Sequence, residues 1–178
     1  MLKQVVILAA GRGSRLDRVD TPKPLVAVGG IPICVRLLKQ LGKAGIERAV
    51  VVVGHRDREL VHGLAGEHGL EVRFVVNPDW ETGLVSSVLA AREHVDEAFV
   101  VAMADHVFED DIVRTIVSQR SGAALVMAVD DRVDEVFDLD SAVKVTLRPS
   151  VHGARVGVCG RGLTPFNAVD AGLFTATQ

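Results

Sequence analysis

The chain has 178 residues, a formal net charge of −3 and an aromatic content of 4%. The acidic balance argues against a general nucleic-acid binder, and the scarcity of aromatic side chains argues against a stacking platform for bases. A chain of this length fits one domain, residues 1–178, and none of its apolar runs is long enough for a membrane-spanning helix. Cys34 and Cys159 stand alone in the sequence, which indicates reduced thiols and a cytoplasmic protein.

Apolar runs alternate with helical patterns along the first two thirds of the chain. Strands are expected over 4–10, 49–53, 72–76, 99–103 and 123–129, and helices over 31–44, from a cap at Asp57 to about 68, 85–94 and 109–119. The alternation predicts an α/β fold, a doubly wound and mostly parallel sheet with helices on both faces. Three further strands, at 143–147, 154–158 and 168–175 with a hairpin turn over 150–153, predict a small antiparallel annex. Because edge strands can pair between copies of a chain, the edge strands of this annex keep a homo-oligomer as an alternative to a monomer.

A loop of small residues follows the first strand, in the segment Leu8-Ala9-Ala10-Gly11-Arg12-Gly13-Ser14-Arg15-Leu16. Backbone N–H groups of such a loop can approach anionic oxygens closely, because little side chain stands in the way. Arg15 and Lys23 add positive charge, and the prolines on both sides of Lys23 predict an extended segment that aims its ammonium group. Together these features indicate a site for a polyphosphate.

Two better-known phosphate loops do not fit this segment. A Walker loop ends in Gly-Lys followed by Ser or Thr, whereas Gly13 is followed by Ser14 and Arg15. A dinucleotide-binding fingerprint would need glycine or alanine where Leu16 stands, and an acidic residue closing the second strand, which instead ends in Gly54.

Further candidate residues follow other strands at the same edge of the predicted sheet. Gly83 comes after the third strand and Asp105 directly after the fourth. Ligands of such sheets bind at the carboxyl ends of the strands, and a carboxylate beside a phosphate loop is suited to Mg²⁺. Asp170 is a candidate second carboxylate. We interpret His106 as a hydrogen-bonded residue at a strand end and Trp80 as a side chain that packs its own loop.

The segment from Leu8 to Leu25, together with Asp105, resembles the nucleotidyltransferase family that includes sugar-1-phosphate pyrophosphorylases. The resemblance extends over nearly the whole chain and implies the Rossmann-like nucleotidyltransferase fold. The stretch 77–83, with the two serines that follow it, is similar to the base-recognition stretch of cytidylyltransferases. Segments 104–109, 141–145 and 167–172 resemble the inositol-1-phosphate cytidylyltransferases in particular.

This resemblance implies a Mg²⁺-dependent enzyme that transfers CMP from CTP to inositol 1-phosphate and releases pyrophosphate. Arg15 would neutralise the leaving pyrophosphate, and Lys23 would hold phosphate oxygens of both reactants. Asp105 and Asp170 would bind Mg²⁺, and Lys144 is the candidate for the acceptor's phosphate. The implied nucleotide-binding residues are Leu8, Ala9, Ala10, Gly11, Gly13 and Ser14 at the phosphates, and Gly83 with Ser86 or Ser87 at the base.

Other functions stay open at this point. The acceptor could be molybdopterin, phosphocholine or a sugar 1-phosphate, with a cytidylyl, uridylyl or guanylyl group transferred. A non-catalytic, nucleotide-binding regulatory subunit is a second alternative, although such a protein should have lost Arg15, Lys23 or Asp105. The chain stops shortly after Asp170, where members of the family generally continue. We therefore expect either a compact stand-alone form or a piece that lacks a C-terminal part.

Overall fold

The computed structural model describes residues 1–13, 20–66, 68–120, 122–151 and 153–177. The chain forms two compact units, the first made of Met1–Val126 with Phe174–Gln178 and the second of Met127–Leu173. Among the described residues, every helix is too short or too polar to span a bilayer.

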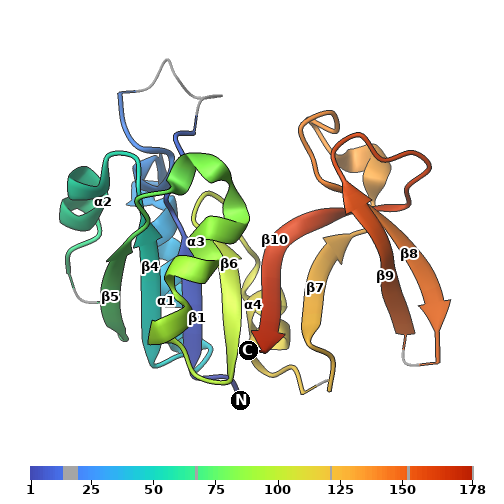
Figure 1. Cartoon of the computed structure of the whole chain (residues 1–178), viewed down its shortest axis with the longest axis horizontal. Coiled ribbons are helices and arrows are strands. Elements are labelled where there is room, and N and C mark those ends of the chain that lie inside the picture. Colours follow the sequence, from blue (N-terminus) through green and yellow to red (C-terminus); the bar gives the residue numbers. More distant parts are fainter. Residues whose placement is uncertain (14–19, 67, 121, 152, 178) are drawn as a thin grey trace. The chain divides into compact units, whose positions relative to one another are not determined.

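A parallel sheet forms the centre of the first unit, as the sequence predicts (Figure 1). Its strands are β1 (Gln4–Leu8), β4 (Arg48–Val53), β5 (Glu71–Val76) and β6 (Ala98–Met103). They lie in the order β5-β4-β1-β6, and the end of β10 (Ala168–Thr177) follows β6. The central strand β1 is buried along its whole length, with Val6 opposite both Val50 and Val101. All four parallel strands therefore end at the same edge.

Helices cover both faces of this sheet, which confirms the doubly wound arrangement. In Figure 1, α3 crosses the front of the sheet, and α1 and α4 lie behind it. Alternate residues of β1 point to opposite faces of the sheet. Val6 and Leu8 belong to a buried apolar cluster, and Val88 of α3 packs against this cluster. The helices are α1 (Ile33–Lys43), α2 (Asp57–Gly63), α3 (Leu84–Ala90) and α4 (Asp110–Val117).

Four predicted helix boundaries differ from those in the structure. The first helix begins at Ile33 rather than at 31, because residues 31–32 form strand β3 (Ile31–Pro32) against β2 (Ala27–Val28). Helix α2 ends at Gly63 rather than near 68, and Asp57 is its first residue and not its cap. Helix α3 ends at Ala90, and a separate 3-10 turn, η4 (Arg92–His94), follows it.

The second unit is built on an antiparallel hairpin, as expected for the annex. Strands β8 (Lys144–Ser150) and β9 (Gly153–Gly160) pair over their whole length, with Ser150 opposite Gly153 at the predicted turn. Strand β10 joins β8 through Ala168 opposite Val145, and β7 (Leu125–Asp130) pairs with β10. The 3-10 turn η5 (Val133–Glu135) lies between β7 and β8 in the chain.

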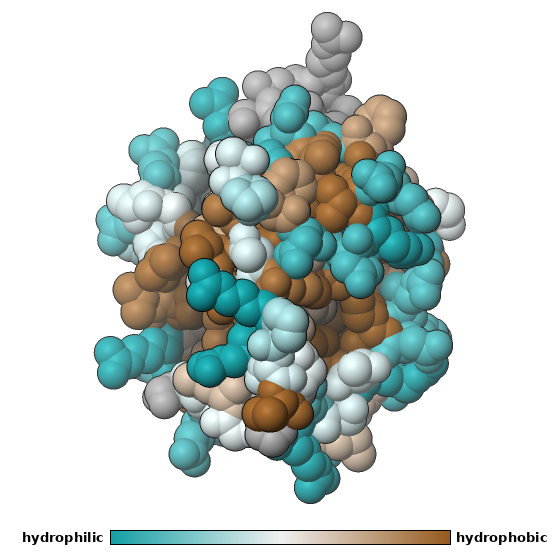
Figure 2. Space-filling model, turned by 90° about the vertical axis from the view of Figure 1, so that its right-hand side faces the viewer, coloured by the Kyte–Doolittle hydropathy of each residue, from teal (hydrophilic) through white to brown (hydrophobic). Residues whose placement is uncertain are grey.

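The outer strand of this hairpin leaves apolar side chains in contact with solvent. Figure 2 views the molecule from the side on which Figure 1 draws β8 and β9, and it shows hydrophobic side chains exposed among hydrophilic ones. Val156 is 44% and Val158 is 51% exposed. Pairing of this edge between copies of the chain stays a prediction.

Candidate active site

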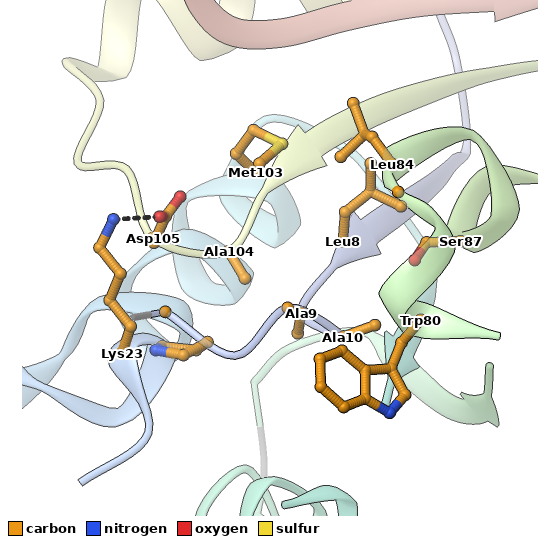
Figure 3. Close-up of a pocket in the computed structure, with 14 residues that line it drawn as sticks. Leu8, Ala9, Ala10, Lys23, Trp80, Leu84, Ser87, Met103, Ala104 and Asp105 are labelled. Atoms are coloured by element: carbon orange, nitrogen blue, oxygen red, sulfur yellow. Dashed lines mark hydrogen bonds and ion pairs between the residues drawn. The ribbon is translucent and has the colours of Figure 1, made fainter. Parts of the chain in front are cut away.

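A pocket opens in the first unit at the edge of the sheet where β1 and β6 end (Figure 3). Fourteen residues line it, and nine of them are residues that the sequence singled out. These nine are Leu8, Ala9, Ala10, Gly11, Gly13, Lys23, Gly83, Ser87 and Asp105. The other five were not expected from the sequence as site residues: Pro24, Trp80, Leu84, Met103 and Ala104.

The small-residue loop enters the pocket directly from β1. The N–H of Ala9 donates to Val52 O at 2.9 Å, so this residue contributes space and not a free donor. Gly11 has open space where a Cβ would stand. Gly13 has a φ of +69°, and a Cβ there would lie 3.3 Å from Cβ of Lys23. Glycine at 13 therefore permits both the left-handed backbone and the close approach of the lysine.

Lys23 is held in a turn, so the prediction of an extended segment was wrong. Residues 23–25 form the 3-10 turn η2 (Lys23–Leu25), closed by a hydrogen bond of 2.8 Å from Leu25 N to Pro22 O. Pro24 occupies an early position of this turn, where a missing N–H costs no hydrogen bond. The two prolines thus favour a turn that begins at Lys23 and directs its side chain to the pocket.

Lys23 and Asp105 form an ion pair in the pocket, which Figure 3 marks with a dashed line. Nζ of Lys23 donates to Oδ2 of Asp105, and the side chains are only 28% and 21% exposed. Nδ1 of His106 lies 2.8 Å from the other carboxylate oxygen, Oδ1, which confirms His106 as a hydrogen-bonded residue. Burial by itself would raise the pKa of Asp105, but the hydrogen bonds from His106 and Lys23 outweigh it and hold the pKa well below its usual range. Asp105 is therefore ionised at neutral pH.

The opposite wall of the pocket is formed by Gly83 and α3. Of the two serines expected near the base, Ser87 lines the pocket and is 5% exposed. Oγ of Ser86 instead donates within its own loop, to Gly83 O at 2.8 Å or Asp79 O at 3.0 Å. Ser87 is therefore the serine that the pocket presents to a ligand.

Trp80 both packs its loop, as expected, and lines the pocket. It begins the 3-10 turn η3 (Trp80–Thr82), and its ring centroid lies 5.2 Å from that of His55. A Cβ on Gly54 would come within 2.7 Å of Trp80 Cβ, so only glycine allows this contact. Gly54, which follows the neighbouring strand β4, is the residue that makes room for Trp80. Nothing in the sequence alone connects these two residues.

The structure does not test four of the predicted site residues. Ser14 and Arg15 lie outside the described residues. Lys144 and Asp170 belong to the second unit. Nζ of Lys144 donates to Arg161 O at 2.9 Å, and Oδ1 of Asp170 accepts a hydrogen bond of 2.7 Å from Gly172 N. The roles given to these four residues stay predictions.

The pocket suits a divalent cation that arrives with phosphates. The described residues contain no group of three His, Cys, Asp or Glu side chains placed to hold a metal by themselves. Mg²⁺ does not need one, since it commonly binds through one or two carboxylates and the substrate's phosphates. The ionised carboxylate of Asp105, in the wall of the pocket, fits that mode of binding.

Comparison with known proteins identifies the family. A family model described as the MobA-like NTP transferase domain matches residues 5–157. The chain belongs to this family. Nucleotidyltransferases generally use a divalent metal ion, which agrees with the chemistry of the pocket.

Curated relatives share this region within longer proteins. A "Bifunctional IPC transferase and DIPP synthase" of Rubrobacter xylanophilus is 41% identical over 97% of this chain and 38% of its own length. A "CMP-5'-(3-aminopropyl)phosphonate synthase" of Streptomyces rubellomurinus is 39% identical over 68% of this chain and 20% of its own length. The chain therefore spans less than half of these relatives.

Solved structures share the fold. The inositol-1-phosphate CTP transferase from T. maritima superposes with a TM-score of 0.86 at 26% identity, over 99% of this chain and 71% of that one. A UDP-glucose pyrophosphorylase superposes with a TM-score of 0.78 at 18% identity, over 99% and 76% of the two chains. The Rossmann-like nucleotidyltransferase fold expected from the sequence is confirmed.

Proposed function

We propose that this chain transfers CMP from CTP to inositol 1-phosphate and releases pyrophosphate. One observation carries the proposal: the glycine loop, Lys23, Asp105 and Ser87 meet in one pocket of a MobA-like NTP transferase domain. The printed names of the Rubrobacter relative and of the T. maritima structure support the nucleotide and the acceptor. The family match over residues 5–157 supports one nucleotidyltransferase domain, and the two free cysteines support a cytoplasmic location.

The reaction is an attack of an acceptor phosphate oxygen on the α-phosphorus of CTP. A new P–O bond forms, the bond to the β-phosphate's bridging oxygen breaks, and pyrophosphate leaves with the electron pair. No general base is required, because the attacking phosphate is already an anion. Lys23 would exchange its contact with Asp105 for phosphate oxygens and so offset their charge. Arg15 is proposed to do the same at the leaving pyrophosphate.

The remaining roles follow from the chemistry of each group. Asp105 is proposed to hold Mg²⁺ together with Asp170, and the bound ion would supply Lewis-acid stabilisation at the α-phosphate. Gly11 and Gly13 would bring backbone N–H groups to the triphosphate, while Ser87 faces the base. Lys144 is proposed to contact the acceptor's phosphate.

The proposal is tested by measuring pyrophosphate release with Mg²⁺ and inositol 1-phosphate, in parallel with CTP, UTP, GTP and ATP. We expect release with CTP alone, and none when EDTA removes the metal. If CTP raises the melting temperature but no pyrophosphate is released, the nucleotide site is retained and inositol 1-phosphate is rejected as the acceptor. No release and no thermal shift with any nucleotide would overturn the proposal.

A phosphonate is the second candidate acceptor. The Streptomyces relative, named for a CMP-phosphonate, is 39% identical over 68% of this chain. Phosphonates and phosphate monoesters offer the same attacking oxygen, so the pocket described here would serve both. The same assay with 3-aminopropylphosphonate, a sugar 1-phosphate, phosphocholine or molybdopterin in place of inositol 1-phosphate decides the acceptor.

A further inference from the structure

Asn77 follows strand β5 and is almost completely buried, with 2% of its surface exposed. Its Oδ1 accepts a hydrogen bond of 2.9 Å from the backbone N–H of Asp79. Because a backbone N–H can only donate, this contact fixes the orientation of the amide group. The oxygen faces Asp79, and the Nδ2 group faces helix α3.

The Nδ2 group of Asn77 donates to two hydroxyls of α3. It lies 3.0 Å from Oγ of Ser86 and 3.0 Å from Oγ of Ser87. Each hydroxyl accepts in this contact, so its own proton cannot go to Nδ2 and stays available for another acceptor. The proton of Ser86 is donated within its loop. For Ser87, no protein acceptor is found in the part of the chain that the structure describes.

Ser87 is placed to donate into the pocket. Figure 3 shows it on α3 in the pocket wall, with its oxygen toward the interior. A hydroxyl with little access to water and no acceptor is unfavourable, so a bound molecule that offers an acceptor at this point is favoured. Lys23 and Asp105, the charged groups of the pocket, are not bonded to Ser87.

We propose that Asn77 is a positioning residue that keeps the Ser87 hydroxyl available as a hydrogen-bond donor to the base of the bound nucleotide. The inference rests on the proposed CTP site. Cytosine presents acceptors to such a donor, at its carbonyl oxygen and its unprotonated ring nitrogen. Asn77 does not touch the nucleotide. It acts through Ser87, by donating to its oxygen so that the hydroxyl proton points away from the amide.

Asn77→Asp tests the direction of the hydrogen bond between residue 77 and Ser87, with almost no change in the shape of the side chain. The new carboxylate can still accept from Asp79 N–H, but it replaces the Nδ2 donor with an oxygen that accepts the proton of Ser87. We expect the Kd of CTP, measured by isothermal titration calorimetry, to rise about tenfold. Binding of inorganic triphosphate, which has no base, should stay within about twofold, because the effect is confined to the base side.

Ser87→Ala completes the test and remains informative if the buried carboxylate of the Asn77→Asp variant prevents folding. It should weaken CTP binding to the same extent as Asn77→Asp. The double variant should show no further loss of CTP affinity, because both changes remove the same donor to the base. Thr82→Val is the matched control: it removes a hydroxyl of the neighbouring turn η3, which donates to Asp79 O at 2.7 Å. Its CTP affinity should be unchanged.

The outcomes separate the two proposals. A wild-type protein that binds no nucleotide would overturn the CTP site and the role of Asn77 together. CTP binding by the wild type that is equally tight in Ser87→Ala or Asn77→Asp would overturn the role of Asn77 alone. Parallel losses of CTP and inorganic triphosphate in Asn77→Asp would also overturn it, since they would show a purely structural role.

Discussion

Nζ of Lys23 and Oδ2 of Asp105 are hydrogen-bonded in one wall of the pocket, although their residues are 82 positions apart in the sequence. The two charges neutralise each other in this ion pair. A triphosphate would attract Lys23, and its accompanying cation would attract Asp105, so binding exchanges this internal pair for two contacts with the ligand. The pair therefore holds both side chains at the position where the proposed reaction would use them.

Lys23→Met and Asp105→Asn should each abolish transfer while the fold persists. Loss of a charge that contacts the reacting phosphates typically costs about a hundredfold or more in turnover. The pair is partly exposed, so the free energy of unfolding should fall by only about 1 kcal/mol. Pyrophosphate release and urea unfolding measure the two effects. Lys39→Met, which removes an exposed lysine of α1, is the control, and near-normal turnover in either site variant would refute the mechanism.

Gly13→Ala and Gly11→Ala should differ in stability, although they stand two residues apart in one loop. At 13 the backbone is left-handed and a Cβ would meet Lys23, whereas at 11 a Cβ meets no atom within 4 Å. We expect Gly13→Ala to lose about 1–2 kcal/mol of unfolding free energy. This loss corresponds to a melting temperature lower by about 3–6 °C, while Gly11→Ala melts like the wild type. Equal melting temperatures would contradict the conformation at Gly13.

The stability that the Asp105 carboxylate contributes should depend on pH in the acidic range only. The pKa of Asp105 is held below its usual range in the folded protein, so the charged form is favoured by folding. This contribution is complete above about pH 4, the ordinary value for aspartate, and is lost as pH falls toward the lowered folded pKa. The difference in unfolding free energy between wild type and Asp105→Asn, measured without metal, should be constant from about pH 8 to 5 and shrink below about pH 4. A difference that changes near neutral pH would argue against an ionised Asp105.

The two cysteines should react with a thiol reagent at very different rates. Cys34 is fully buried in α1, and burial raises the pKa of its thiol to about 12, whereas Cys159 is exposed on β9. Since the thiolate is the reactive form, Ellman's reagent should label one thiol of the native protein at once and the second only after unfolding. Cys159→Ser should remove the fast phase alone. Two fast thiols in the native protein would contradict the packing of α1.

The local sequence was enough to predict the parallel sheet and the edge of the sheet at which the pocket lies. The run Gln4–Leu8 is buried at every position and apolar after its first residue, and a strand of that kind is stable only between two other strands and two covered faces. The loop after it and Asp105 after β6 follow strands that run in the same direction, so their meeting at one edge could be predicted. Hydrophobic periodicity is a local property, and the sequence alone was enough for this part.

Only the tertiary structure decided which side chains contact one another. The turn at Lys23 and the end of α2 depend on each other, because a Cβ on Gly63 would lie 2.5 Å from Cδ1 of Leu25. Ser87 was distinguished from Ser86 by the carbonyl oxygens of Gly83 and Asp79, which take the hydroxyl proton of Ser86, while Ser87 lines the pocket. Such contacts depend on distances and hydrogen-bond directions between separate elements. The local pattern of residues does not contain these, because they arise only when the elements pack together.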